Sequence, residues 1–68
     1  MNIILNGKPV HIENKMTSIL DLLKSYNLDP DINIVELNEE IVDKNRYKDL
    51  MINQEDRIEI IRFMGGGK

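Results

Sequence analysis

The C-terminal stretch RIEIIRFMGGGK holds the residues best suited to chemistry in this sequence. The whole sequence has four glycines, and three of them, Gly65, Gly66 and Gly67, directly precede Lys68. A glycine segment has no side chains, so it can thread a channel that is too narrow for other residues. Because an unhindered glycine carboxylate can be activated as an acyl-adenylate, the segment suggests a tail that presents its carboxyl group to a partner enzyme. The alternative is a frayed end that takes part in no chemistry.

Few other side chains offer chemistry. His11 is the only histidine, and its position in an alternating pattern predicts an outward-facing strand residue. The only serines, Ser18 and Ser25, have no obvious base beside them, and the acidic pairs Glu39–Glu40 and Glu55–Asp56 fall in predicted turns. The sequence has no cysteine, which excludes a thiolate zinc site. We therefore expect no catalytic residue, no metal site and no bound cofactor.

Length and charge narrow the function classes further. A chain of 68 residues is one domain at most, and such a domain buries roughly 60% of the surface of its unfolded chain. The net charge is −3, and the basic residues are scattered apart from a loose cluster at Lys44, Arg46 and Lys48, which argues against nucleic-acid binding. No segment approaches the ~20 apolar residues of a membrane span, and the N-terminus has no signal-peptide pattern. We expect a cytoplasmic protein.

The first half of the chain predicts a hairpin followed by a helix. In NIILNGKPVHIE, apolar and polar residues alternate on both sides of Asn6-Gly7, a dipeptide that favours a tight hairpin turn. Pro9 cannot donate to a strand ladder, which places the second strand at a sheet edge. TSILDLLKSYNL then changes to a helical period. The predicted helix begins at Thr17 or Ser18 and ends before Pro30. The predicted apolar face of this helix consists of Ile19, Leu22, Leu23 and Tyr26.

The second half predicts further strands. We expect a third strand over INIVEL and a short extended piece that begins at Ile41 and Val42. The polar segment DKNRYKDL should form a single helical turn, and the last strand should span RIEIIRF. One helix must then cover one face of a mixed sheet. We expect the first and last strands to lie side by side at its centre, because both are rich in isoleucine. This is an α+β, ubiquitin-like β-grasp fold with four to five strands, with a domain over 1–64 and a flexible tail over 65–68.

The strand alternation assigns the two faces of the sheet. The face toward the helix should carry a single core cluster, composed of Ile3, Leu5, Val10, Ile12, Ile19, Leu23, Val35, Ile58 and Ile60. Ile61 and Phe63 then point to the opposite face, and Ile4 and Ile34 join them there. Apolar residues gathered on an open sheet face mark a partner surface. We therefore predict partner docking at Phe63, Ile61, Ile4 and Ile34, next to the glycine tail. The alternative is a few scattered exposed apolar residues that bind no partner.

Several motifs resemble one family along the whole chain. They are LNGK at 5–8, TSILDLLKSYNL at 17–28, VELNEEIVDKNRY at 35–47 and EDRIEIIRFMGGG at 55–67. In these motifs and in length, the sequence resembles the ThiS family, the ubiquitin-like sulfur carriers of thiamine biosynthesis. Family members end in glycine, whereas this sequence continues to Lys68. A thiocarboxylate on Gly67 would require Lys68 to be absent or removed.

The resemblance implies a protein co-substrate and not an enzyme. An E1-like adenylyltransferase would use ATP to adenylate Gly67. A sulfur donor system that includes a cysteine desulfurase would then convert the adenylate to a thiocarboxylate. Thiazole synthase would finally take up the sulfur. Two alternatives stay open. One is a carrier for molybdopterin or another thiolated product, and the other is a β-grasp interaction module whose tail does no chemistry.

Overall fold

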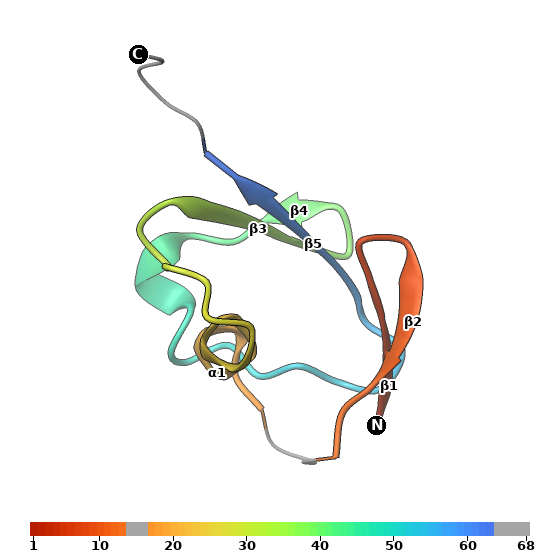
Figure 1. Ribbon diagram of the computed structural model, residues 1–68. Coiled ribbons are helices and arrows are strands. Elements are labelled where there is room, and N and C mark those ends of the chain that lie inside the picture. The colour runs from red at the N-terminus through yellow and green to blue at the C-terminus, as the bar shows by residue number, and fades with distance from the viewer. Residues whose placement is uncertain (14–16, 64–68) are drawn as a thin grey trace.

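The computed structural model describes residues 1–13 and 17–63, and they form the expected mixed sheet with one helix on one face (Figure 1). The strands are β1 (Asn2–Leu5), β2 (Lys8–His11), β3 (Asn33–Leu37), β4 (Glu40–Ile41) and β5 (Arg57–Arg62). Their order in the sheet is β2-β1-β5-β3-β4, so β5 is central. β1 and β5 are adjacent and parallel, whereas the other pairs are antiparallel. The predicted β-grasp fold is confirmed.

The hairpin turn adopts the geometry that its dipeptide predicts. Asn6 has φ 50° and Gly7 has φ 82°, both in the left-handed region that a tight hairpin turn requires. β2 pairs only with β1 and forms one edge of the sheet. Pro9 lies in this edge strand, where its missing N–H breaks no ladder hydrogen bond.

The helix α1 (Ile19–Ser25) begins at Ser18, which forms a reciprocal cap. The Ser18 hydroxyl accepts from the Asp21 backbone N–H at 3.0 Å, and the Asp21 carboxylate accepts from the Ser18 N–H at 3.2 Å. The helix ends one residue before Tyr26, whose side chain is 48% exposed, so the prediction that Tyr26 continues the buried face is wrong. In the described part of the chain, no helix is long and apolar enough to cross a membrane.

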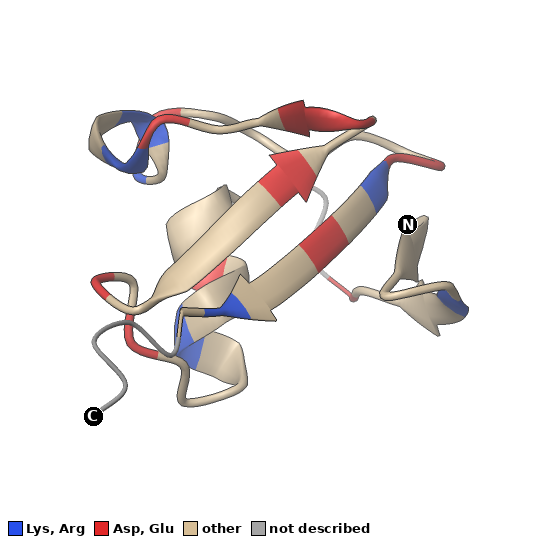
Figure 2. Ribbon diagram, turned by 90° about the horizontal axis from the view of Figure 1, so that it is seen from above, with Lys and Arg blue, Asp and Glu red and all other residues tan. Residues whose placement is uncertain are grey.

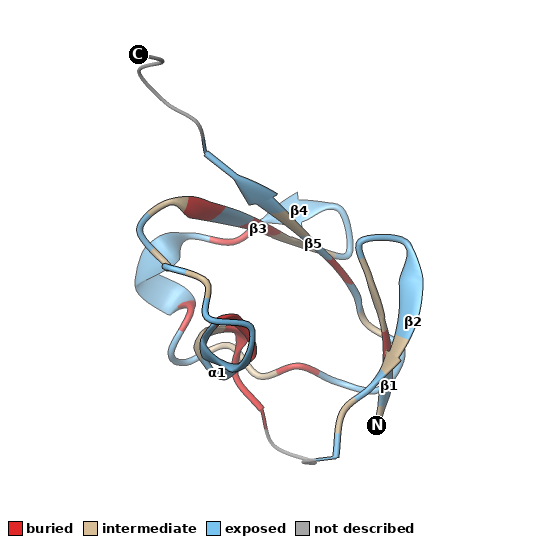
Figure 3. Cartoon of the chain, viewed as in Figure 1, coloured by how far each residue is buried: buried red, intermediate tan, exposed pale blue. Residues whose placement is uncertain are grey.

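The core lies between α1 and the sheet (Figure 3). Its buried members are Ile3, Ile19, Leu22, Leu23, Val35, Val42, Tyr47, Ile52 and Ile58. Four residues expected in the core only pack against it and stay partly exposed; these are Leu5, Val10, Ile12 and Ile60. Three buried residues, Val42, Tyr47 and Ile52, were not predicted, because the segment that carries them has no helical or strand period.

The segment between β4 and β5 closes the side of the core. It includes the 3₁₀ helix η1 (Lys44–Arg46), which confirms the predicted single turn. Ile19 N–H donates to the Leu50 carbonyl at 3.0 Å, and Ile52 N–H donates to the Thr17 carbonyl at 2.8 Å. These bonds hold the segment against the start of α1. The helix and this segment therefore cover one face of the sheet and leave the other to solvent.

Candidate functional site

The tail leaves the domain from a fixed point at the end of β5. Phe63 is the last described residue, and its backbone N–H donates to the Ile32 carbonyl at 2.7 Å. Arg62 pairs with Asn33 across β5 and β3, so the sheet extends to the residue before Phe63. Gly65, Gly66, Gly67 and Lys68, together with the predicted boundary between residues 64 and 65, lie outside the described residues.

Exposed apolar side chains gather next to this exit point. Ile34 and Ile61 lie directly opposite each other in the β3–β5 register, and their side chains are 36% and 46% exposed. Phe63 follows on the same face with 59% exposure. Ile41 on β4 is 72% exposed and lines the same groove as Ile34 and Phe63. We call these four residues, Ile34, Ile41, Ile61 and Phe63, the apolar patch.

Ile4 shares the face of the apolar patch but not its position. In the parallel β1–β5 register Ile4 lies beside Arg57, four positions before Ile61 along β5. Glu59 occupies the position between them on the same face. Of the four residues predicted for docking, Phe63, Ile61 and Ile34 are thus brought together, while Ile4 stands apart from them.

A groove runs beside the apolar patch toward the start of β3. It encloses about 310 Å³ and is lined by Pro30, Ile34, Ile41, Val42 and Phe63, among others. Lys44 and Asp31 also line it and form an ion pair at 2.9 Å. The hydrogen bond to Asp31 raises the pKa of Lys44 above its ordinary value. An apolar surface with a polar rim, here an ion pair, can hold a hydrophobic segment of a partner protein.

Two residues near the site escaped prediction. Ile41 was assigned only to a short extended piece, although its strand partner, Glu36, places it on the open face. Tyr47 follows the polar run DKNR, yet it is 4% exposed and its hydroxyl donates to the Asn33 carbonyl at 2.9 Å. Burial raises the pKa of Tyr47. A signal for Tyr47 existed, because an aromatic residue in a polar turn must usually cover something apolar.

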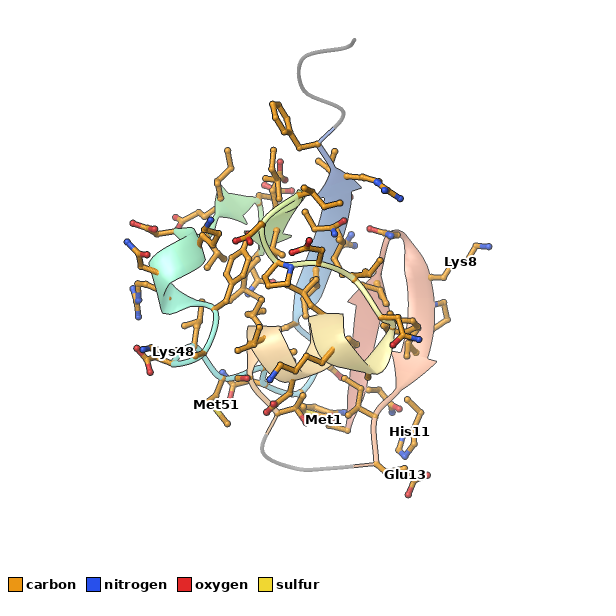
Figure 4. The ribbon with its side chains drawn as sticks, turned by 60° about the vertical axis from the view of Figure 1, so that its left-hand side comes forward. Met1, Lys8, His11, Glu13, Lys48 and Met51 are labelled. Carbon is orange, nitrogen blue, oxygen red and sulfur yellow. The ribbon has the colours of Figure 1, made fainter. Side chains whose placement is uncertain are left out.

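The other polar side chains considered for chemistry are engaged in local structure. His11 Nδ1 lies 2.8 Å from Asn2 Oδ1, and Figure 4 shows His11 and Glu13 at the end of the molecule opposite the C-terminal end of β5. Ser25 donates to the Leu22 carbonyl at 2.7 Å within the helix. Asp56 accepts from the Asn53 N–H at 2.7 Å and so closes a turn. Among residues 1–13 and 17–63, no group of acidic or histidine side chains could hold a metal ion.

Comparisons with known proteins agree along the whole chain. A model of the ThiS family matches residues 3–67, which include the three glycines but not Lys68. The sulfur carrier protein ThiS of Bacillus subtilis (strain 168) is 48% identical over 63 residues, which cover 93% of this chain and 96% of that protein. The crystal structure of the thiamine biosynthesis protein ThiS from Geobacter metallireducens superposes with a TM-score of 0.86 at 29% identity, covering 98% of this chain and 100% of that one.

A further match is to an enzyme. A thiazole synthase of Magnetococcus marinus is 34% identical over 68 residues, which cover 100% of this chain. This chain spans only 21% of that synthase. The similar region of the synthase is therefore the size of one complete domain of the kind seen here.

Proposed function

The chain belongs to the ThiS family of sulfur carrier proteins of thiamine biosynthesis, and we propose that Gly67 is the residue whose carboxyl group carries the sulfur. The observation that carries this proposal is the family match, which runs to Gly67 and stops there. A ThiS protein is a co-substrate on which partner enzymes act. The carrier for molybdopterin and the module without chemistry are set aside, because the matches are to thiamine proteins.

The proposed chemistry takes place on the tail. Where the chain ends at Gly67, with Lys68 absent or removed, the terminal carboxylate attacks the α-phosphorus of ATP in an E1-like adenylyltransferase, and pyrophosphate leaves. A sulfur donor system that includes a cysteine desulfurase then forms a protein persulfide, and a second thiol reduces it, so that the outer sulfur is released as sulfide and the two thiols form a disulfide. This sulfur attacks the carbonyl carbon, AMP leaves, and a thiocarboxylate remains. Thiazole synthase finally takes the sulfur into the thiazole ring.

The domain contributes by aiming the tail. Four extended residues, Met64 to Gly67, can reach at most about 14 Å beyond Phe63. A partner must therefore hold the domain close to its own active site. The apolar patch lies next to the end of β5, so a partner that covers Ile34, Ile61 and Phe63 would receive the glycines in a fixed direction. Gly65 and Gly66 would thread the entrance channel, where a side chain would clash.

An intact-mass experiment tests the proposal. The chain ending at Gly67 is incubated with the adenylyltransferase of the same organism, ATP and sulfide. We expect a mass gain that corresponds to the exchange of one oxygen for sulfur, and fragmentation should place it on Gly67. A matched sample without ATP should keep its mass. An unchanged mass in the complete reaction, with an adenylyltransferase shown to be active on another carrier, would reject Gly67 as the sulfur site.

A further inference from the structure

Two carboxylates face each other at the centre of the open sheet face. Glu36 on β3 and Glu59 on β5 lie directly opposite in the antiparallel register, two positions along from the Ile34–Ile61 pair. Side chains alternate along strands, so the Glu36–Glu59 pair shares the face of Ile34 and Ile61 and points away from α1. Figure 2, which looks onto this face, shows the acidic positions of β3 and β5 side by side.

These carboxylates line a small notch. It encloses about 60 Å³ and is lined by Ile4, Gly7, Glu36, Glu39, Arg57, Ile58 and Glu59. A cavity needs roughly 10–15 Å³ of such space to hold one water, so the notch has room for several waters or one compact polar group. Three carboxylates stand against the single guanidinium of Arg57. The only ion pair in the described part of the chain joins Lys44 to Asp31, so none of the three has an ionic partner there.

Electrostatics favours a basic occupant for this notch. Like charges directly opposite across two strands destabilise a sheet, and Arg57, the one cation that lines the notch, forms no ion pair with Glu36 or Glu59. An incoming ammonium or guanidinium group would offset the repulsion between these two carboxylates. The side chain of Ile4, which is partly exposed, adds apolar lining that suits the aliphatic stem of a lysine or arginine. The notch also adjoins the apolar patch, since Ile41 pairs with Glu36 and Ile61 follows Glu59 by two residues.

We propose that this notch receives a lysine or arginine side chain of thiazole synthase, and that the apolar patch and the notch form one continuous docking surface. This inference rests on the proposed function of the tail. The synthase is the partner that the notch should fit, because the whole chain is similar to one domain-sized part of the Magnetococcus marinus enzyme. The charged contact would fix the orientation of the domain on the synthase and speed the encounter.

The test compares two double variants with the same change in charge. Glu36→Gln/Glu59→Gln removes the opposed carboxylates, whereas Glu13→Gln/Glu55→Gln removes two exposed carboxylates away from the notch. Binding to purified thiazole synthase is measured by calorimetry at low and high salt. We expect the notch variant to bind at least about tenfold more weakly at low salt and to lose most of its salt dependence. The control variant should stay within about twofold of the unsubstituted chain.

The melting temperature is a second measurement, and we expect it not to fall when the affinity does. Because a repulsion is removed, the melting temperature of the notch variant should stay level or rise by a few degrees, up to roughly 5 °C. Weaker binding together with an undiminished melting temperature supports the proposal. The inference is overturned if the synthase binds both variants equally, or if only adenylyltransferase binding falls. If the notch variant unfolds, the single variant Glu59→Gln is compared with Glu13→Gln instead. A melting temperature of Glu59→Gln below that of the unsubstituted chain also overturns the inference.

This experiment separates the inference from the proposed function. Calorimetry reports docking and needs no adenylation, whereas the mass gain on Gly67 reports activation. A chain that gains sulfur but whose notch variant binds the synthase normally keeps the proposed function and loses the docking inference. A chain that binds the synthase through the notch but never gains sulfur keeps the docking inference and loses the proposed function.

Discussion

The hydroxyl of Tyr47 donates a hydrogen bond of 2.9 Å to the backbone carbonyl of Asn33, and both residues are buried. Asn33 pairs with Arg62 at the end of the sheet from which the tail departs. Tyr47 also accepts at its carbonyl from the Leu20 N–H, at 2.9 Å, in the helix. One residue thus joins the helix, the segment after β4 and the start of β3.

Removing this hydroxyl should destabilise the whole domain. In Tyr47→Phe the ring remains in the core, but the buried Asn33 carbonyl loses a donor. We expect the free energy of unfolding to fall by about 1–2 kcal/mol, measured by urea denaturation. Tyr26→Phe is the matched control, since Tyr26 is 48% exposed and should tolerate the change. A Tyr47→Phe protein as stable as the parent would show that the hydrogen bond contributes nothing.

The same residue predicts a loss of stability at alkaline pH. Burial raises the pKa of Tyr47 above its ordinary value of 10.0, so the folded state holds the phenolic proton more tightly than the unfolded state. The stabilisation from this difference is complete below the unfolded pKa and is lost as pH rises through the folded one. The free energy of unfolding, measured at a series of pH values from 8 to about 11.5, should therefore fall more steeply with pH for the parent than for Tyr47→Phe. Parallel curves would contradict the raised pKa.

The helix face is tested by Leu23→Ala. Leu23 is fully buried at the centre of the core, and its truncation should cost about 2–5 kcal/mol. A domain of this size rarely gains more than about 3–5 kcal/mol from its core, so the variant should be largely unfolded at 25 °C by circular dichroism. Leu20→Ala, at a partly buried position on the same helix, should keep a cooperative melt.

Local signals in the sequence were sufficient to predict most of the fold. Asn6-Gly7 and Ser18 specify their turn and cap through their own backbone and hydroxyl groups, so neighbouring residues suffice to predict them. The pairing of β1 with β5 followed from the isoleucine content of the two strands. Tyr47 and Ile52 could not be placed in this way, because their segment is irregular and its burial depends on where α1 lies.

The proposed docking surface was predictable only in part. Alternation along β5 correctly put Ile61 and Phe63 on the open side, where both are exposed. The opposition of Glu36 and Glu59 depends on the register between strands that are distant in sequence, which no local pattern fixes. The same register decides that Ile4 lines the notch and stands apart from the apolar patch.

Activation should depend on which residue carries the terminal carboxylate. Adenylation needs a free carboxylate at the end of the threaded glycines, and Lys68 would move it one residue outward and bring a long charged side chain into the channel. ATP–pyrophosphate exchange with the adenylyltransferase should be near background for the chain ending at Lys68 and clear for the chain ending at Gly67. Both chains should melt alike, which serves as the control for folding. Equal exchange by both would contradict the requirement for a terminal Gly67.

The apolar patch is tested by Phe63→Asp. Phe63 is 59% exposed, so an aspartate there meets water and the domain should melt within a few degrees of the parent. On a partner, however, the carboxylate would be driven into an apolar contact, and we expect binding to both adenylyltransferase and thiazole synthase to weaken at least about tenfold. Tyr26→Asp makes the same chemical change at an exposed aromatic residue on the helix side and should bind normally. An unfolded Phe63→Asp would make this residue part of the core, and a folded variant with unchanged affinity for both partners would remove the apolar patch from the docking surface.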